Sequence, residues 1–493
     1  MSRGRRRLDR VIDSSAGSEP VVADGRRRRP RDTPRGGPLS QPYRWLSIGM
    51  FALIFIAAFE VMAVTTIMPL VAEELHGESL FALAFSVPFA AGVVGMVASG
   101  NWADRSGPLP PLIAAGVLFS IGLVIAGLAP NMEVLVLGRL VHGIGGTAVT
   151  VPLYVIVARV YPEHLRARVF AGFAAAWVIP SIVGPAVAGV IAEQASWRWV
   201  FLGVIVLVLP AAGMMLRPLL RVHDLVAGDP TVRWSLSRLG WSVLAAAGAL
   251  GVSLAKELGE PWRWVVAAAA IAVAVVAVRP LLPAGTLRAA RGMPATVLLR
   301  AVVAGAFFGS EIYLPYLLID RYEFSPSLAG VVLTGAGLSW AAASWVQGRL
   351  GERMSNTDAV RVGTGVLAVA LVAVLAVSAF SLAPAVAFVA WTAAGAGMGF
   401  MYPRFSVAVL ELSAKSAQGF NSAALNIGEA LSSAIALAIT ALVASVAGTA
   451  AFTADFVVTV LIALVGVVLA PRMRPAGEGG GLRYGVAPAA SVD

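Results

Sequence analysis

The feature that most constrains this chain is a series of long apolar stretches separated by short polar breaks. A helix needs about 20 apolar residues to cross a bilayer, and fourteen stretches of the sequence reach or approach that length. Because lipid offers no hydrogen-bond partners, such stretches must form helices that satisfy their own backbone groups. The predicted spans lie near 45–70, 80–100, 110–129, 133–158, 167–192, 197–216, 239–256, 262–279, 294–318, 327–348, 359–381, 384–410, 417–446 and 452–470.

The composition also favours an all-α polytopic membrane protein. The chain is 58% hydrophobic and 13% charged, whereas soluble domains carry about 25% charged residues. It contains no Cys, which excludes disulfides, thiol catalysis and Cys-ligated metals. Neither lysine, Lys256 or Lys415, stands in the Gly-Lys-Ser/Thr order of a phosphate-binding loop. We therefore expect neither a self-contained ATP-driven pump nor a cofactor or metal site.

Basic residues are distributed as the positive-inside rule requires. Residues 1–44 contain 12 arginines and are predicted to form a disordered cytoplasmic tail, or one that contacts anionic lipid headgroups. An even number of spans places both termini in the cytoplasm. The predicted inner loops and C-terminal tail then hold 18 basic residues and the outer loops 4. The net charge of +10 thus reflects membrane topology and not nucleic-acid binding. We predict a multi-pass protein of a bacterial inner (plasma) membrane.

Two motifs occur twice in the chain. The segment "GNWADR" (100–105) recurs as "GRLGER" (348–353), and "GIGGTAVTVPLYVIVARV" (143–160) is echoed by "GAGMGFMYPRFSVAVLEL" (395–412). The offsets of 248 and 252 residues indicate a duplicated six-helix block with two extra helices between the copies. The predicted domains are a tail (1–44), an N-terminal six-helix bundle (45–217), a linker with the two extra helices (218–293), a C-terminal six-helix bundle (294–470) and a cytoplasmic C-terminal tail (471–493).

Several charged residues lie inside predicted spans. Glu60 and Glu311 are 251 residues apart, close to the repeat offset, so we expect them to be pseudo-symmetric. An ionisable group at this depth costs at least about 3 kcal/mol unless it faces a cavity or a partner. Such groups either form a buried pair that fixes packing or carry protons, since a carboxyl in a low-dielectric site can exchange a proton near neutral pH. The predicted proton-coupling residues are Glu60, Glu311, Arg139 and Glu429.

These motifs, in this order, resemble the major facilitator superfamily and specifically its 14-helix drug:proton antiporter branch. The resemblance covers nearly everything from residue 45 to residue 470. "GNWADRSG" is similar to the loop motif between helices 2 and 3, and "LGRLVHGIGG" to the helix 4 motif with Arg139. "GPAVAG" is similar to the antiporter motif of helix 5, and "SWRWVF" (196–201) is also characteristic. The matched antiporter residues are Gly184, Pro185 and Gly189.

The resemblance implies a secondary active transporter that exports amphipathic or cationic drugs in exchange for protons by alternating access. Such multidrug efflux confers antibiotic resistance. In the family, the loop motif closes the cytoplasmic side, so Asp104 would be the latch. Its expected partners are Arg105 and the N-terminus of the predicted span 417–446. The expected gate residues are Gly100, Asp104, Arg105, Gly107, Glu352 and Arg353.

The resemblance also implies a substrate cavity between the two bundles. We expect the protein to bind a small-molecule substrate and protons, to be surrounded by lipid bilayer and to be a monomer. The polar and aromatic residues expected to line it are Glu60, His142, Trp177, Phe307, Phe308, Glu311, Tyr313, Trp340 and Asn426.

Other functions remain open at this point. An exporter of an endogenous lipid, siderophore or peptide would have the same fold, and an uptake symporter is opposed only by the helix 5 motif. An intramembrane enzyme would need a nucleophile–base pair or a metal cluster. The four histidines (His76, His142, His164 and His223) fall in separate segments, so no enzymatic activity is expected.

Overall fold

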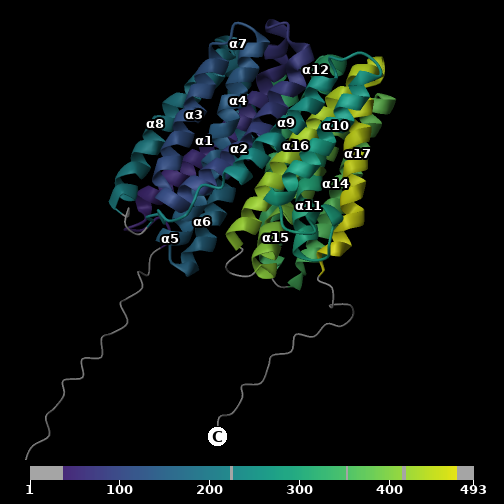
Figure 1. Cartoon of the computed structure of the whole chain (residues 1–493). Coiled ribbons are helices and arrows are strands. Elements are labelled where there is room, and N and C mark those ends of the chain that lie inside the picture. Colours follow the sequence, from purple (N-terminus) through teal and green to yellow (C-terminus); the bar gives the residue numbers. More distant parts are fainter. Residues whose placement is uncertain (1–36, 222–225, 351–352, 414–417, 475–493) are drawn as a thin grey trace, which may run out of the picture. The chain divides into compact units, whose positions relative to one another are not determined.

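The structure is a computed structural model, and it describes residues 37–221, 226–350, 353–413 and 418–474. The chain divides into two units, Met1–Gly37 and Pro38–Asp493, and every described helix belongs to the second unit (Figure 1). Three sequence predictions fall outside the described residues. They concern most of the Arg-rich tail, the gate residue Glu352 and most of the C-terminal tail.

The described residues form α-helices and short 3-10 turns, with no strand among them. The predicted all-α fold is therefore confirmed. The helices are α1 (Arg44–Glu74), α2 (Phe81–Ser106), α3 (Leu109–Gly127), α4 (Met132–Ala148), α5 (Thr150–Val160), α6 (Glu163–Ala175), α7 (Val178–Gln194), α8 (Arg198–Arg221), α9 (Leu236–Ala255), α10 (Trp262–Val278), α11 (Met293–Glu311), α12 (Tyr313–Tyr322), α13 (Pro326–Leu350), α14 (Asn356–Phe380), α15 (Pro384–Leu412), α16 (Gln418–Ala447) and α17 (Ala451–Leu469).

In the described part of the chain, thirteen helical segments are long and apolar enough to cross a membrane. The α4–α5 pair counts as one such segment, and the α11–α12 pair as another. The predicted span 167–192 corresponds to α6 and α7, and α7 is apolar but only 17 residues long. The polytopic architecture thus follows the prediction, except that the fifth predicted span, divided into α6 and α7, is not among the thirteen segments.

Prolines explain where three of the spans are interrupted. Pro152, Pro180 and Pro315 each occupy the third position of a helix, in α5, α7 and α12 respectively. A proline has no N–H for the carbonyl four residues earlier, and its ring clashes with that carbonyl. Each break therefore falls about four residues before the proline, and the third break comes directly after Glu311. By contrast, α15 stays continuous through Pro403, the repeat equivalent of Pro152.

Equivalent glycines allow equivalent helices to cross closely in the two copies. A Cβ at Gly143 would meet the backbone of Pro88, where α4 crosses α2. A Cβ at Gly395 would meet the backbone of Ala336, where α15 crosses α13. The positions are related by the offsets read from the sequence, so each copy of the repeat makes the same small-residue contact.

The first extra helix, α9, packs against both halves of the molecule, here defined as α1–α8 and α11–α17. It contacts α2 on one side and α16 on the other (Figure 1). The Ser86 and Ser253 hydroxyls lie 3.2 Å apart between α2 and α9, and Val252 of α9 shares an apolar cluster with Leu442 of α16. The halves also contact each other directly through α2 with α16 and α7 with α13. The linker helix therefore does more than space the two halves.

Candidate functional site

In the N-terminal half, a buried ionic cluster joins α1, α2 and α4. Arg139 Nη1 donates a hydrogen bond to Oε1 of Glu60, a residue that is 1% exposed. His142 Nε2 lies 3.2 Å from Glu60 Oε2. Arg139 Nε also donates to the Ala84 carbonyl at 3.2 Å. Arg139 and His142 are three residues apart on α4, so they share a face. The structure thus brings together Glu60, Arg139 and His142, all of which were predicted from the sequence as site residues.

This cluster contains one permanent charge and two groups that can exchange protons. The guanidinium of Arg139 keeps its proton under all physiological conditions. Its ion pair compensates the Glu60 carboxylate, which would otherwise be costly to bury. The charge of the cluster therefore changes only when Glu60 or His142 gains or loses a proton. The His142 ring packs on Phe119, with centroids 4.8 Å apart, which holds the imidazole beside Glu60.

The C-terminal half has its own ion pair, between Arg300 of α11 and Glu429 of α16. Arg300 Nη2 and Nε donate to Glu429 Oε2 at 2.7 Å and 3.0 Å. Arg300 Nη2 also donates to Asn426 Oδ1 at 3.2 Å, and the guanidinium lies 4.5 Å from the Tyr402 ring centroid. Glu429 and Asn426 are three residues apart on α16, so they share a face. Arg300 was not among the residues predicted for the site.

Glu311 stands apart from both ion pairs. It is buried at the C-terminal end of α11, and its carboxylate has no hydrogen-bond or ion-pair partner among the described residues. The repeat offset that aligns Gly143 with Gly395 places Trp391 at the position of Arg139. At the position that corresponds to Arg139, the C-terminal copy of the repeat therefore has a tryptophan and not a guanidinium.

An aromatic cluster follows the inner face of α11. Phe307, one turn before Glu311, stacks on Trp391 with centroids 4.7 Å apart. The Trp340 ring lies 5.6 Å from Phe307 and 5.1 Å from Tyr402. Phe307 and Trp340 were predicted cavity residues, but Trp391 and Tyr402 were not, because aromatic residues are common throughout membrane helices.

The remaining predicted cavity residues lie elsewhere. Phe308 turns toward the other half and approaches Phe89 of α2, with ring centroids 5.9 Å apart. Tyr313 is buried after the α11–α12 break, with its hydroxyl 3.4 Å from Thr440 Oγ1. Trp177 lies at the α6–α7 break and is 43% exposed.

The sequence analysis overlooked a fourth intramembrane acid, Asp455 of α17. It is 1% exposed, and its Oδ1 has no hydrogen-bond partner in the described residues. A signal was available, because Asp455 is the single charged residue in the apolar stretch Ala451–Leu469.

At the expected gate, the loop motif binds the linker that follows α8. The Asp104 carbonyl accepts from Asp229 N at 2.9 Å, and Arg105 Nη1 donates to the Val232 carbonyl at 3.3 Å. Gly107 has a φ of +78°, which favours glycine, and a Cβ there would lie 2.7 Å from the Val226 carbonyl. The motif glycine is therefore needed both for its conformation and for this close approach.

The linker turn itself is held by Asp229. Its Oδ1 accepts hydrogen bonds from Thr231 N at 2.9 Å and Thr231 Oγ1 at 2.6 Å. These bonds stabilise the charged form and hold the pKa of Asp229 below its usual value. The turn therefore presents an ionised carboxylate at neutral pH, next to the loop motif.

The guanidiniums whose charges act on the Asp104 carboxylate belong to Arg159 of α5 and Arg238 of α9. Arg238 also lies over the Phe420 ring of α16, 5.4 Å from its centroid. Arg238 thus lies beside the N-terminal end of α16, and the expected contact of Asp104 with that helix end stays a prediction. Arg353, from the second copy of the motif, is exposed.

The antiporter motif on α7 faces α1 and α13. A Cβ at Gly184 would lie 3.2 Å from Met62 Cβ of α1, and one at Gly189 would lie 3.3 Å from Ser327 Cβ of α13. Pro185 packs against Gly330 of α13. The small residues thus let α7 approach the other half closely.

Comparisons with known proteins agree with this architecture. The family described as Major Facilitator Superfamily matches residues 50–436. The multidrug efflux pump SdrM of Staphylococcus aureus is 22% identical over 79% of this chain and 88% of its own length. The probable multidrug-efflux transporter Rv1634 of Mycobacterium tuberculosis is 26% identical over 75% of this chain and 81% of its own. The transporter sphD of Aspergillus fumigatus is 30% identical, but the match spans only 32% of that longer protein and 38% of this chain.

Solved structures show the same fold at low identity. A D-xylose–proton symporter aligns with a TM-score of 0.62 and 15% identity, over 89% of this chain and 99% of that one. The peptide transporter POT in complex with sulfate gives a TM-score of 0.64 and 16% identity, over 89% and 97%. With a family match over most of its length and this fold, the chain is a membrane transporter that belongs to the major facilitator superfamily.

Proposed function

We propose that this protein exports amphipathic or cationic compounds in exchange for protons, by alternating access across a bacterial plasma membrane. Both termini would lie in the cytoplasm. The observation that carries the proposal is Glu311, a buried carboxylate that has no counter-ion among the described residues. Phe307 lies one helical turn before it on α11 and stacks on Trp391 of α15.

A lone buried charge explains why proton and substrate would exclude each other. Ionised Glu311 is costly to bury unless its charge is compensated. Either a bound proton or a cationic ligand removes that cost. Once one of them is bound, the carboxylate is compensated and the other gains nothing by binding. The aromatic faces beside Glu311 attract cations through their electron density. Release of the proton when the cation binds, and uptake of a proton when the cation leaves, amounts to antiport at one site.

The Glu60 cluster has a different role in this proposal. Arg139 already supplies the counter-ion for Glu60, so a cationic substrate gains less by binding there. We assign His142, 3.2 Å from Glu60 Oε2, as the group that passes protons to and from this carboxylate. Glu60 on α1 and His142 on α4 also connect these two helices, so a change in the charge of either side chain would change how the helices pack.

The named relatives support export. SdrM and Rv1634 are described as multidrug efflux proteins, and each match covers most of both chains. The likeness to proton symporters concerns the fold alone. The direction of transport is therefore the first property to measure.

The test uses proteoliposomes with an imposed pH gradient, and internal pH is followed as ethidium is added. Native protein should show ethidium-evoked proton flux, with proton and ethidium moving in opposite directions. Glu311→Gln should reduce that flux at least tenfold, because the amide can neither ionise nor exchange a proton. Glu257→Gln, an exposed carboxylate just after α9, is the control and should behave as native.

Each other outcome contradicts a specific part of the proposal. Unchanged flux in Glu311→Gln would remove Glu311 from the coupling site. Movement of ethidium and protons in the same direction would make the protein an uptake symporter. The absence of flux with several cationic dyes would favour a carrier of an endogenous lipid, siderophore or peptide.

A further inference from the structure

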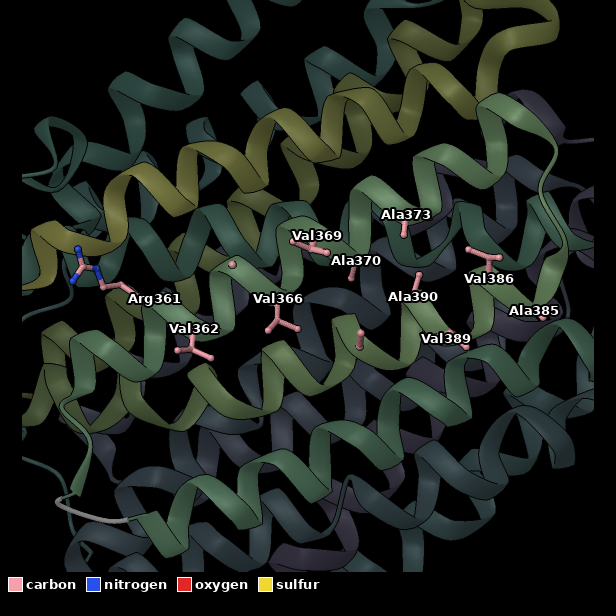
Figure 2. A pocket seen from close by; sticks show the side chains of 12 residues that line it. Arg361, Val362, Val366, Val369, Ala370, Ala373, Ala385, Val386, Val389 and Ala390 are labelled. Atoms are coloured by element: carbon pink, nitrogen blue, oxygen red, sulfur yellow. The ribbon is translucent and has the colours of Figure 1, made fainter.

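A groove on the outer surface of the C-terminal half is not explained by transport. It lies between α14 and α15 and has a volume of about 730 Å³. Figure 2 shows alanine and valine side chains along its length, with Arg361 at one end. The lining is otherwise apolar, and Gly365 and Ala370 keep it open.

The groove faces the surroundings of the protein and not the aromatic cluster. Val369 and Val389, which line it from either helix, are 72% and 71% exposed. Trp391, on the inner face of α15, is buried and stacks on Phe307 instead. In a membrane-spanning bundle, the exposed apolar face of these helices is the one that meets lipid.

The end at Arg361 carries an excess of positive charge. Arg361 Nη1 lies 3.7 Å from Asp358 Oδ1, and Arg474 Nη2 donates to the same oxygen at 3.0 Å. Two guanidiniums therefore share one carboxylate. The side chains of Arg361 and Arg474 are each 47% exposed, so their remaining donors are available to an anion from outside.

The length of the groove suits one leaflet of a bilayer. Its α14 wall runs from Arg361 to Ala373, a rise of about 18 Å at ~1.5 Å per residue. Half of the hydrocarbon core of a bilayer is about 15 Å thick. An acyl chain whose headgroup lies level with Arg361 would thus extend along the groove to the membrane midplane.

We propose that this groove binds one acyl chain of an anionic phospholipid, whose phosphate is held by Arg361 and Arg474. The charge decides among possible occupants. A cationic drug would be repelled at the Arg361 end, and a helix from a second copy would leave the two guanidiniums without an anion. The proposal does not depend on which substrate the transporter carries.

The test measures lipid retained by the purified full-length protein, by native mass spectrometry in detergent. Phosphatidylglycerol and phosphatidylcholine with identical chains are titrated in parallel. We expect one tightly held phosphatidylglycerol and weaker phosphatidylcholine. Arg361→Gln should weaken phosphatidylglycerol about fivefold, since one basic residue contributes about 1 kcal/mol at an anionic lipid surface. Gly365→Leu should abolish retention by filling the groove, because a Cβ there meets nothing within 4 Å.

Matched controls lie on α8, where Arg217 and Gly213 have the same four-residue spacing as Arg361 and Gly365. A Cβ at Gly213 also meets nothing within 4 Å. Arg217→Gln and Gly213→Leu should leave retention unchanged. If Gly365→Leu does not fold, Arg361→Gln still decides the question.

Three results would overturn the proposal. In the first, the protein retains phosphatidylglycerol and phosphatidylcholine equally, and Arg361→Gln does not change the retention of either lipid. Another is displacement of the lipid by glycerol phosphate alone, which would indicate a phosphate site without a chain. The third is a native dimer that Gly365→Leu converts to monomer with lipid retention unchanged, which would make the groove an interface between copies.

Discussion

Glu60 and Glu311 are 251 residues apart, close to the repeat offset, yet their surroundings differ. Glu60 faces Arg139 and His142, whereas Glu311 lies at a helix break near Phe307 and Trp391. Among the described residues, the same residue type is thus charge-compensated in one half and uncompensated in the other. At the scale of single residues, the contribution of each acid to stability should depend on its partner and not on its depth.

Removing Arg139 should be more harmful than removing the whole pair. Arg139→Gln leaves Glu60 buried without its counter-ion, which costs about 3–5 kcal/mol when one member of a buried pair is lost. Thermal unfolding in detergent should show a large loss of stability, and the Arg139→Gln/Glu60→Gln double variant should recover part of it. Strictly additive losses would mean that the pair is not a coupled unit.

Two acids in the C-terminal half should respond in opposite ways. Glu429→Gln leaves Arg300 without its carboxylate and should lower thermal stability by about 3 kcal/mol. Asp455→Asn removes a side chain whose Oδ1 has no hydrogen-bond partner in the described part of the chain and should leave stability unchanged or raise it. The same unfolding assay compares the two. An equal loss in both variants would show that Asp455 has a partner in the folded protein.

At the scale of elements, prolines and glycines determine where helices break and where they cross. The break after Glu311 follows from Pro315, and it ends the regular helix at the acid proposed to exchange protons. The close crossing of α2 and α4 follows from Gly143. These residues shape the site without touching a ligand.

Gly143→Ala tests the importance of this crossing. The added methyl group would meet the backbone of Pro88, which cannot move aside as a side chain can, and such overpacking typically costs about 1–3 kcal/mol. Gly116→Ala on α3 is the control, because a Cβ there meets nothing within 4 Å. We expect lower thermal stability for the first variant only. Equal stability of both would show that α2 and α4 separate easily.

Helical periodicity and the cost of burying charge were enough to predict the helices and to select Glu60 and Arg139, which the structure brings into one buried ion pair. They were not enough for contacts that join distant segments. Nothing local shows that Arg300 pairs with Glu429, 129 residues away, or that the linker near Val226 covers Gly107. The division of the fifth span was also missed, although Pro180 was visible, because membrane helices often tolerate proline.

At the scale of the whole molecule, alternating access requires the contact between α7 and α13 to open. The chain contains no Cys, so an introduced pair can only react with itself. Gly189→Cys with Ser327→Cys would place two Cβ atoms about 3.3 Å apart, near the ~3.5–4.5 Å range of disulfides. Oxidation should stop ethidium transport, and a reductant should restore it.

The single Gly189→Cys and Ser327→Cys variants show the effect of each substitution without the cross-link. Full transport by the cross-linked protein, with the disulfide verified by mass, would show that the two helices stay together throughout the cycle. In that case the halves would have to move about another interface.

The position of α9 has a kinetic consequence. A helix that packs on α2 and on α16 cannot keep both contacts unchanged while the two halves rotate against each other. One of these two contacts must therefore slide, and the activation free energy of sliding contributes to the barrier of every turnover, whatever compound is carried. Two transporters with identical cavities but different linker helices would then bind their substrates alike and run at different speeds. We therefore expect the packing of α9 to affect the turnover rate of this protein more than its affinity for substrate.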